Sequence, residues 1–178
     1  NVPTRDNPTG DTEFNVNDVL VQGLLIKAVN KDFAFGFGTQ LIVPTGTDDS
    51  FSANRWQLVP TAGARWSLPQ ITKGSFFVFA TRYAFDFAGD DGRPHTSVLQ
   101  FSPTLNIALP DRWFLTLFPS TDIRVDLENG GKWFVPANFL IGKMLNRTTV
   151  ASLEFGIPII KQFDLYDFKV EGRIGFFF

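Results

Sequence analysis

The chain has 178 residues, a formal net charge of −2, no cysteine and a single histidine. This length suits one domain, and the lack of cysteine excludes a disulfide framework and thiolate metal sites. The weakly acidic balance gives no basic signal for nucleic acid, so we expect no nucleic-acid partner. Phe is frequent, at 21 residues, while the mean hydropathy is near zero, which indicates apolar residues distributed evenly among polar ones.

Alternation of apolar and polar residues dominates the chain from residue 18 onward, and no segment keeps a helical period. In residues 112–128 the apolar residues take the odd positions and mostly polar residues the even ones. The pattern predicts an all-β, antiparallel fold with nine strands, at residues 18–29, 33–44, 55–68, 75–88, 96–109, 112–127, 132–144, 149–160 and 168–178. These strands exceed the usual length of about 5–6 residues in globular sheets, and a tilted membrane strand needs about 9–11.

The predicted connections alternate in length. Short turns are expected at 30–32, 69–74, 110–111 and 145–148. Mostly longer and more polar loops are expected at 45–54, 89–95, 128–131 and 161–167. Short periplasmic turns opposite longer outer loops are typical of bacterial outer-membrane barrels.

The tryptophans separate a membrane barrel from a soluble β-sandwich, which would also alternate but would bury its apolar face. Trp56, Trp66, Trp113 and Trp133 all have apolar-face parity and lie near strand ends. The ten residue steps from Trp56 to Trp66 span about 33 Å at about 3.3 Å each. At a tilt of roughly 40° this gives about 25 Å of height, the thickness of a lipid-facing apolar band. The four indoles therefore predict an aromatic girdle at the membrane interfaces.

The C-terminal residue gives the predicted barrel a direction. Phe178 resembles the terminal signal read by the barrel assembly machinery of the bacterial outer membrane, so we expect the last strand to run toward the periplasm. Residues 1–17 then form an extracellular loop and residues 18–178 the strands of a single transmembrane barrel domain. Outer-membrane lipid and lipopolysaccharide are the expected surroundings.

Nine strands do not close a bacterial barrel, whose strand number is even. An open edge in lipid leaves backbone groups unpaired at several kcal/mol each. We expect residues 1–178 to be the larger, C-terminal part of the barrel. Strands preceding Asn1 or a second chain would complete it, and a homo-oligomer remains an option.

Several segments resemble the outer-membrane family described as the meta-pathway of phenol degradation, or simply as transporters. The resemblance extends over most of residues 13–178 and includes GFGTQLIVPTGTDD (36–49), RWQLVPTAG (55–63), FAGDDGRP (87–94), SPTLNIALPDRWFLT (102–116) and KWFVPANFLIGK (132–143). It implies a barrel of about twelve strands, an even number as in other bacterial barrels. It also implies passage of small, often hydrophobic or aromatic, compounds.

Charged residues of both signs have inward parity. They are Arg55, Arg65, Arg82, Asp86, Asp122, Arg124, Asp126, Glu154, Lys169, Glu171 and Arg173. We predict that they line a polar passage, with a salt-bridged plug as the alternative. A candidate apolar constriction in the periplasmic half comprises Phe76, Phe114, Phe118, Leu140 and Phe177. Such a constriction gates by dewetting, and packing beneath the short turns is the other interpretation.

Metal, cofactor and enzyme functions have little support in the sequence. The loop acids Asp48, Asp49, Asp90 and Asp91 could bind Ca²⁺ or bridge lipopolysaccharide, but solvated turn residues are the favoured interpretation. His95 lies near Ser97, whose parity is lipid-facing, so a Ser–His hydrolase is not expected. We predict no metal, no cofactor and no enzymatic activity.

The sequence thus predicts an outer-membrane channel or porin-like transporter for passive passage of small molecules. Two alternatives remain: a structural or interaction barrel whose loops bind a partner, and one wall of a secretion assembly without open-channel activity.

Overall fold

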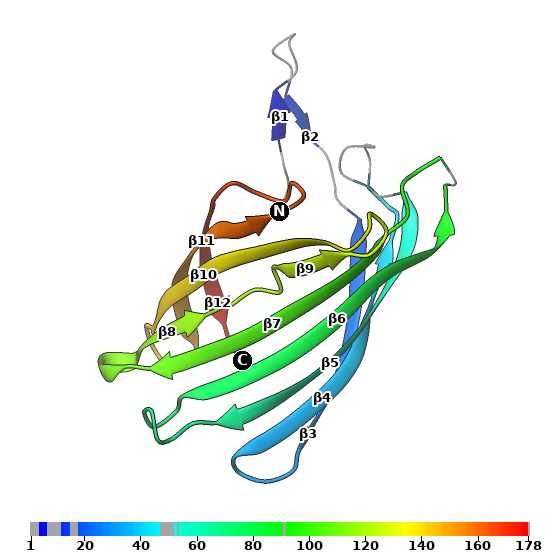
Figure 1. Ribbon diagram of the computed structural model, residues 1–178. Coiled ribbons are helices and arrows are strands. Elements are labelled where there is room, and N and C mark those ends of the chain that lie inside the picture. The colour runs from blue at the N-terminus through cyan, green and yellow to red at the C-terminus, as the bar shows by residue number, and fades with distance from the viewer. Residues whose placement is uncertain are drawn as a thin grey trace.

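The computed structural model describes residues 4–6, 12–14, 18–46, 52, 54–90 and 92–177. Its main sheet has ten antiparallel strands within these ranges, which confirms the predicted all-β, antiparallel fold (Figure 1). The strands are β3 Val19–Ala28, β4 Phe33–Val43, β5 Arg55–Ser67, β6 Phe76–Gly89, β7 Ser97–Ala108, β8 Trp113–Leu117, β9 Ile123–Asp126, β10 Lys132–Met144, β11 Thr149–Lys161 and β12 Lys169–Phe176. No helix among the described residues is long and apolar enough to cross a membrane.

The segment predicted as a loop, residues 1–17, contains a small hairpin. Strand β1, Thr4–Asp6, pairs antiparallel with β2, Thr12–Phe14. The strands have three residues each, too few for alternation to reveal them in the sequence.

Strand order in the main sheet follows the chain, with β3 at one edge and β12 at the other. The sheet curves into a partial ring (Figure 1). Within the described residues, β3 and β12 do not pair with each other, so the ring is open at these two edges.

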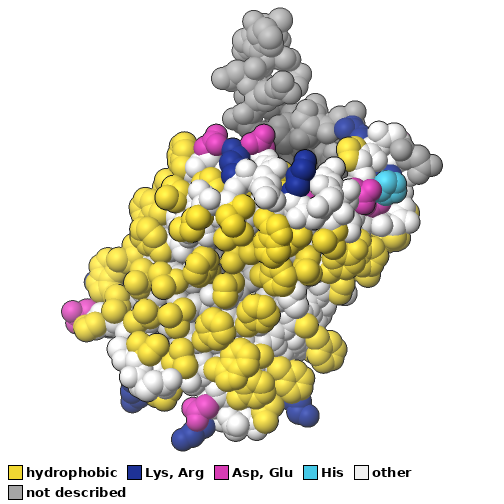
Figure 2. All heavy atoms as spheres, in the orientation of Figure 1, with side chains coloured by type: hydrophobic (Ala, Val, Ile, Leu, Met, Phe, Trp, Pro, Cys, Tyr) yellow, Lys and Arg dark blue, Asp and Glu magenta, His cyan; other side chains and the backbone are white. Residues whose placement is uncertain are grey.

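The two faces of the sheet are inverted relative to those of a water-soluble protein. Apolar side chains on interior strands are exposed, with Phe37 at 56% and Ile157 at 60%. By contrast, Glu154 is 0% exposed and Arg55 4%. Figure 2 shows an apolar band across the middle of the outer face and charged side chains gathered mainly at its two ends.

All four tryptophans lie on the outer face and are between 37% and 41% exposed. Trp66 stacks with Phe77 at a centroid distance of 5.9 Å and packs at a tilt against Phe33 at 5.4 Å. The Nζ of Lys143 lies 4.9 Å from the ring centroid of Trp113. Aromatic rings therefore cluster near strand ends, and at Trp113 a lysine lies against the ring.

The prediction of one continuous strand over residues 112–127 is wrong, because β8 and β9 are separate strands. Six residue steps lead from Leu117 to Ile123, while their partners Leu105 and Phe101 on β7 are four steps apart. Two extra residues are therefore inserted relative to β7. Residues 118–122 form the resulting irregularity, which we call the inner bulge.

Candidate functional site

The inner bulge is fixed to both neighbouring strands. Thr104 Oγ1 of β7 donates to the carbonyl oxygen of Phe118 at 2.7 Å, and Phe118 N donates to the carbonyl oxygen of Asn138 on β10 at 3.0 Å. Phe118 has φ 50°, in the left-handed region, where the backbone leaves the strand. This geometry brings Ser120 into contact with side chains of β11 and β12, and Asp122 into contact with a side chain of β12.

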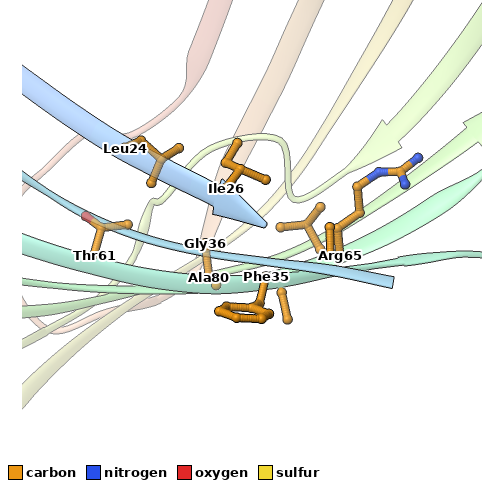
Figure 3. A pocket seen from close by; sticks show the side chains of 11 residues that line it. Leu24, Ile26, Phe35, Gly36, Thr61, Arg65 and Ala80 are labelled. Atoms are coloured by element: carbon orange, nitrogen blue, oxygen red, sulfur yellow. The ribbon is translucent and has the colours of Figure 1, made fainter. Parts of the chain in front are cut away.

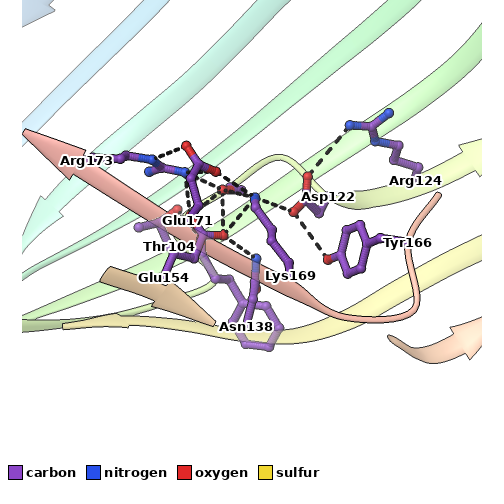
Figure 4. A network of polar contacts seen from close by, with 11 residues as sticks. Thr104, Asp122, Arg124, Asn138, Glu154, Tyr166, Lys169, Glu171 and Arg173 are labelled. Carbon is purple, nitrogen blue, oxygen red and sulfur yellow. Dashed lines mark hydrogen bonds and ion pairs between the residues drawn. The ribbon is translucent and has the colours of Figure 1, made fainter. Parts of the chain in front are cut away.

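Glu154 on β11 lies at the centre of these contacts (Figure 4). Lys169 Nζ lies 3.0 Å from its Oε1, and Arg173 Nη2 lies 2.5 Å from its Oε2. Ser120 Oγ donates to Oε1 and Oε2 at 2.8 and 3.0 Å, and Asn138 Nδ2 donates to Oε1 at 3.3 Å. A fully buried carboxylate thus has two cations and two neutral donors, which compensates its loss of hydration.

A second carboxylate, Glu171 on β12, is the register partner of Glu154. Like charges directly opposite each other destabilise a sheet. Here Arg173 Nε lies 2.7 Å from Glu171 and Lys169 Nζ lies 3.5 Å from it, so the same two cations serve both carboxylates.

Asp122 connects the bulge to the same group. Lys169 Nζ lies 3.1 Å from Asp122, Tyr166 OH donates to it at 3.3 Å, and Arg124 Nη2 lies 3.7 Å away. Among the described side chains, carboxylates and cations balance in this central network, which consists of Asp122, Glu154, Glu171, Arg124, Lys169 and Arg173.

Tyr166 lies outside the strands, in the segment between β11 and β12, and its ring packs edge-on against Phe134 at 4.9 Å. Burial raises the pKa of the Tyr166 hydroxyl, and the neighbouring Asp122 carboxylate raises it further. The folded state therefore keeps this proton at pH values where the unfolded chain loses it, above about 10. The stability contributed by Tyr166 is present below that pH and is lost as the pH rises.

We expect the Tyr166→Phe variant to lose less stability than the parent between pH 8 and 11, because its ring carries no titrating group. Urea midpoints of the folded protein across this range measure the difference. Tyr83→Phe is the control, since Tyr83 lies on the outer face and is 37% exposed. If the urea midpoints of Tyr166→Phe and of the parent changed identically with pH, the raised pKa of Tyr166 would be contradicted.

A separate charged cluster lies at the loop end of β5 and β6. Arg55 Nε lies 2.6 Å from Asp86 Oδ2, and the side chains are 5% and 2% exposed. The Nδ1 of His95 lies 3.0 Å from the same carboxylate, so His95 has an acidic neighbour that its sequence spacing did not identify. Ser97 Oγ instead contacts Tyr83 OH at 3.0 Å.

The other charged residues predicted to line the interior have individual contacts. Arg82 Nη2 donates to Gln40 Oε1. The Arg65 guanidinium lies 4.5 Å from the ring centroid of Phe76. Asp126 accepts from the backbone and side-chain nitrogens of Asn129 at 3.1 and 2.7 Å, so it caps the β9–β10 turn.

The residues of the candidate constriction lie in different environments. The ring of Phe114 covers Gly142, where an added Cβ would collide with it. Leu140 is 6% exposed, whereas Phe177 is 56% exposed and its backbone N donates to Thr148. The constriction itself stays a prediction.

Some predicted residues lie outside the described residues, namely Asp48, Asp49, Asp91 and Phe178. Asp90 Oδ1 accepts from Gly92 N at 2.9 Å, as in an Asx turn. Over the described ranges, no group of three or more His, Asp or Glu residues could hold a metal ion.

Sequence reasoning missed Ser120, Asn138 and Tyr166. The parity of Ser120 and Asn138 is inward, but neither carries a charge that would have marked it. Tyr166 lies in a loop, where alternation gives no direction.

The fold and this site define a curved antiparallel sheet with an apolar outer face and a charged inner face. The family model described as "Putative MetA-pathway of phenol degradation" matches residues 2–130, and the chain belongs to this family. The match ends before β10, so the segment 132–143 of the resemblance lies beyond it. No curated protein and no solved structure matches the chain.

Proposed function

We propose that this chain forms the wall of a bacterial outer-membrane channel for passive passage of small molecules. The observation that carries the proposal is the inversion of the sheet, in which Glu154 is fully buried while Ile157 is 60% exposed. In lipid this arrangement is favourable, since a charge on the lipid-facing side costs about 2–4 kcal/mol at the bilayer midplane. The indoles near the strand ends suit the membrane interfaces, where amphipathic rings concentrate.

The family description supports small aromatic solutes as cargo, because phenol is one. Space along the inner face supports a passage rather than a filled interior. Cavities of about 410 and 230 Å³ lie against this face, one of them beside the inner bulge. We infer that the central network holds the bulge as a fixed narrowing of the passage.

The edges of the sheet need partners in such a setting. Backbone groups on the free sides of β3 and β12 would otherwise be unpaired in lipid at several kcal/mol each. We propose that further strands, from this polypeptide or from another chain, cover both edges in the outer membrane.

Single-channel recording in planar bilayers tests the proposal. We expect discrete conductance steps from the folded full-length protein, together with faster entry of phenol into liposomes that contain it than into protein-free liposomes. A folded, inserted protein with neither conductance nor phenol entry would overturn the channel and favour a structural or interaction barrel.

A further inference from the structure

The larger cavity on the inner face has an unusual lining. It lies between β4, β5, β6 and β7 and the inner bulge, and its volume is about 410 Å³. Its polar lining includes Gln40, Gln57, Arg82, Gln100 and Arg124. The described residues that line it include two arginines and no carboxylate, so the cavity carries positive charge.

Among the described residues, neither arginine has a close ion pair. Within the described residues no carboxylate lies at ion-pair distance from Arg82, whose Nη2 donates to the neutral Gln40. Arg124 reaches Asp122 only at 3.7 Å, and Asp122 also accepts from Lys169 at 3.1 Å. Among the residues that the structure describes, the buried Nε of Arg124 has no hydrogen-bond partner. A buried donor without a partner is costly, and a planar guanidinium fits a carboxylate well.

A second cavity on the inner face is apolar and has a volume of about 230 Å³ (Figure 3). Ala80 lines the apolar cavity, and Arg82, the next inward residue of β6, lines the cationic one. Thr61 of the apolar cavity is the register partner of Arg82. The two cavities therefore follow one another along the same strands.

Small residues form the apolar wall. A Cβ atom at Gly63 would lie 3.0 Å from the carbonyl oxygen of Phe79 and 3.1 Å from Ala80 Cβ. Leu24 and Ile26 of β3 project over this wall (Figure 3). Apolar cavities of roughly 150 Å³ accept benzene, so an aromatic ring fits here.

We propose that the two cavities together bind a small monocarboxylate with an apolar body. The carboxylate lies between Arg82 and Arg124, and the apolar body covers Gly63 and Ala80. The inference deepens the proposed function by naming a class of solute, and its test measures binding instead of conductance.

Isothermal titration of the folded full-length protein in detergent, with benzoate as the probe, tests this site. Benzamide is the neutral isostere, and we expect it to bind at least about tenfold more weakly, because a hydrogen bond to a charged group is worth about 1.5–3 kcal/mol. Octanoate has an alkyl chain as its apolar body, so its affinity shows whether the apolar cavity requires an aromatic ring. Equal affinity for benzoate and benzamide would overturn the proposal.

Variants test whether benzoate binds at the cationic cavity. We expect Arg82→Gln to weaken benzoate binding by about tenfold or more. Arg147→Gln, the same change at an exposed position in the β10–β11 turn, leaves the affinity unchanged. Should Arg82→Gln not fold, Gln57→Glu adds a carboxylate to the cavity lining and is expected to abolish benzoate binding. A benzoate affinity equal to that of the parent, in whichever of Arg82→Gln and Gln57→Glu folds, would refute the site.

The outcomes separate this inference from the channel. Arg82-dependent benzoate binding by a protein that does not conduct would support the site and overturn the channel. Conductance without any benzoate binding would leave the channel and overturn the site.

Discussion

We expect the free energy of unfolding of the Glu154→Gln variant to be about 3 kcal/mol lower than that of the parent. This loss is at the lower end of the cost of breaking a buried ion pair. Glu154 is fully buried, and both Lys169 and Arg173 contact it. Glutamine has nearly the same shape but removes the buried one of the two carboxylates that Lys169 and Arg173 share. The lower end applies because the side chains of Lys169 and Arg173 are 20% and 39% exposed, so water compensates part of the loss.

Urea unfolding of the lipid-inserted protein measures this effect. Glu128→Gln is the matched control, because Glu128 lies exposed in the turn between β9 and β10. We also expect Glu171→Gln to cost less than Glu154→Gln, since the Glu171 side chain is 42% exposed and exposed ion pairs contribute about 0–1 kcal/mol. Equal losses at positions 154 and 128 would show that the central network does not stabilise the fold.

The strands and their two faces were predictable from the sequence because a strand turns alternate side chains to opposite faces. The period is strong in this chain: β10 begins and ends at the residues predicted from the alternation, 132 and 144. Tryptophan positions followed from the same rule, and all four lie on the outer face.

The inner bulge could not be predicted by that rule, for a physical reason. A one-residue insertion would reverse the faces of a strand, but an insertion of two residues restores them. Leu115 before the bulge and Ile123 after it therefore both keep odd, outward parity, and residues 112–127 read as one strand. Only the pairing with β7 and β10 reveals the extra length.

Contacts made by loops were equally hidden. His95 reaches Asp86 and Tyr166 reaches Asp122 from segments without alternation. Their partners were identified as inward-facing charges, but the contacts depend on how each loop folds back over the sheet. Sequence therefore indicated the charges of the site, whereas the loops and the bulge determine how those charges are connected.

Deleting Pro119 and Ser120 tests whether the inner bulge narrows the passage. The deletion removes the two extra residues, so Leu117 and Ile123 become as far apart as Leu105 and Phe101 on β7. The deletion also removes Pro119, which has no backbone N–H to donate to the ladder. Phe118 and Asp122 keep their inward parity, and the straightened strand no longer extends into the interior. We expect a severalfold rise in single-channel conductance, because pore diameter limits conduction.

The Ser120→Ala variant distinguishes the effect of the bulge backbone on conductance from the effect of the Ser120 hydroxyl group. This variant removes the contacts of Ser120 with Glu154 and Lys169 but keeps the inserted residues. A bulge that narrows the passage by its backbone path leaves the conductance of Ser120→Ala close to that of the parent, while the deletion raises it. If Ser120→Ala raised the conductance as much as the deletion does, the narrowing would come from the central network and not from the backbone path of the bulge. An unchanged conductance in a folded deletion variant would place the narrowest point elsewhere, and the apolar set around Phe114 and Leu140 would then be the next segment to alter.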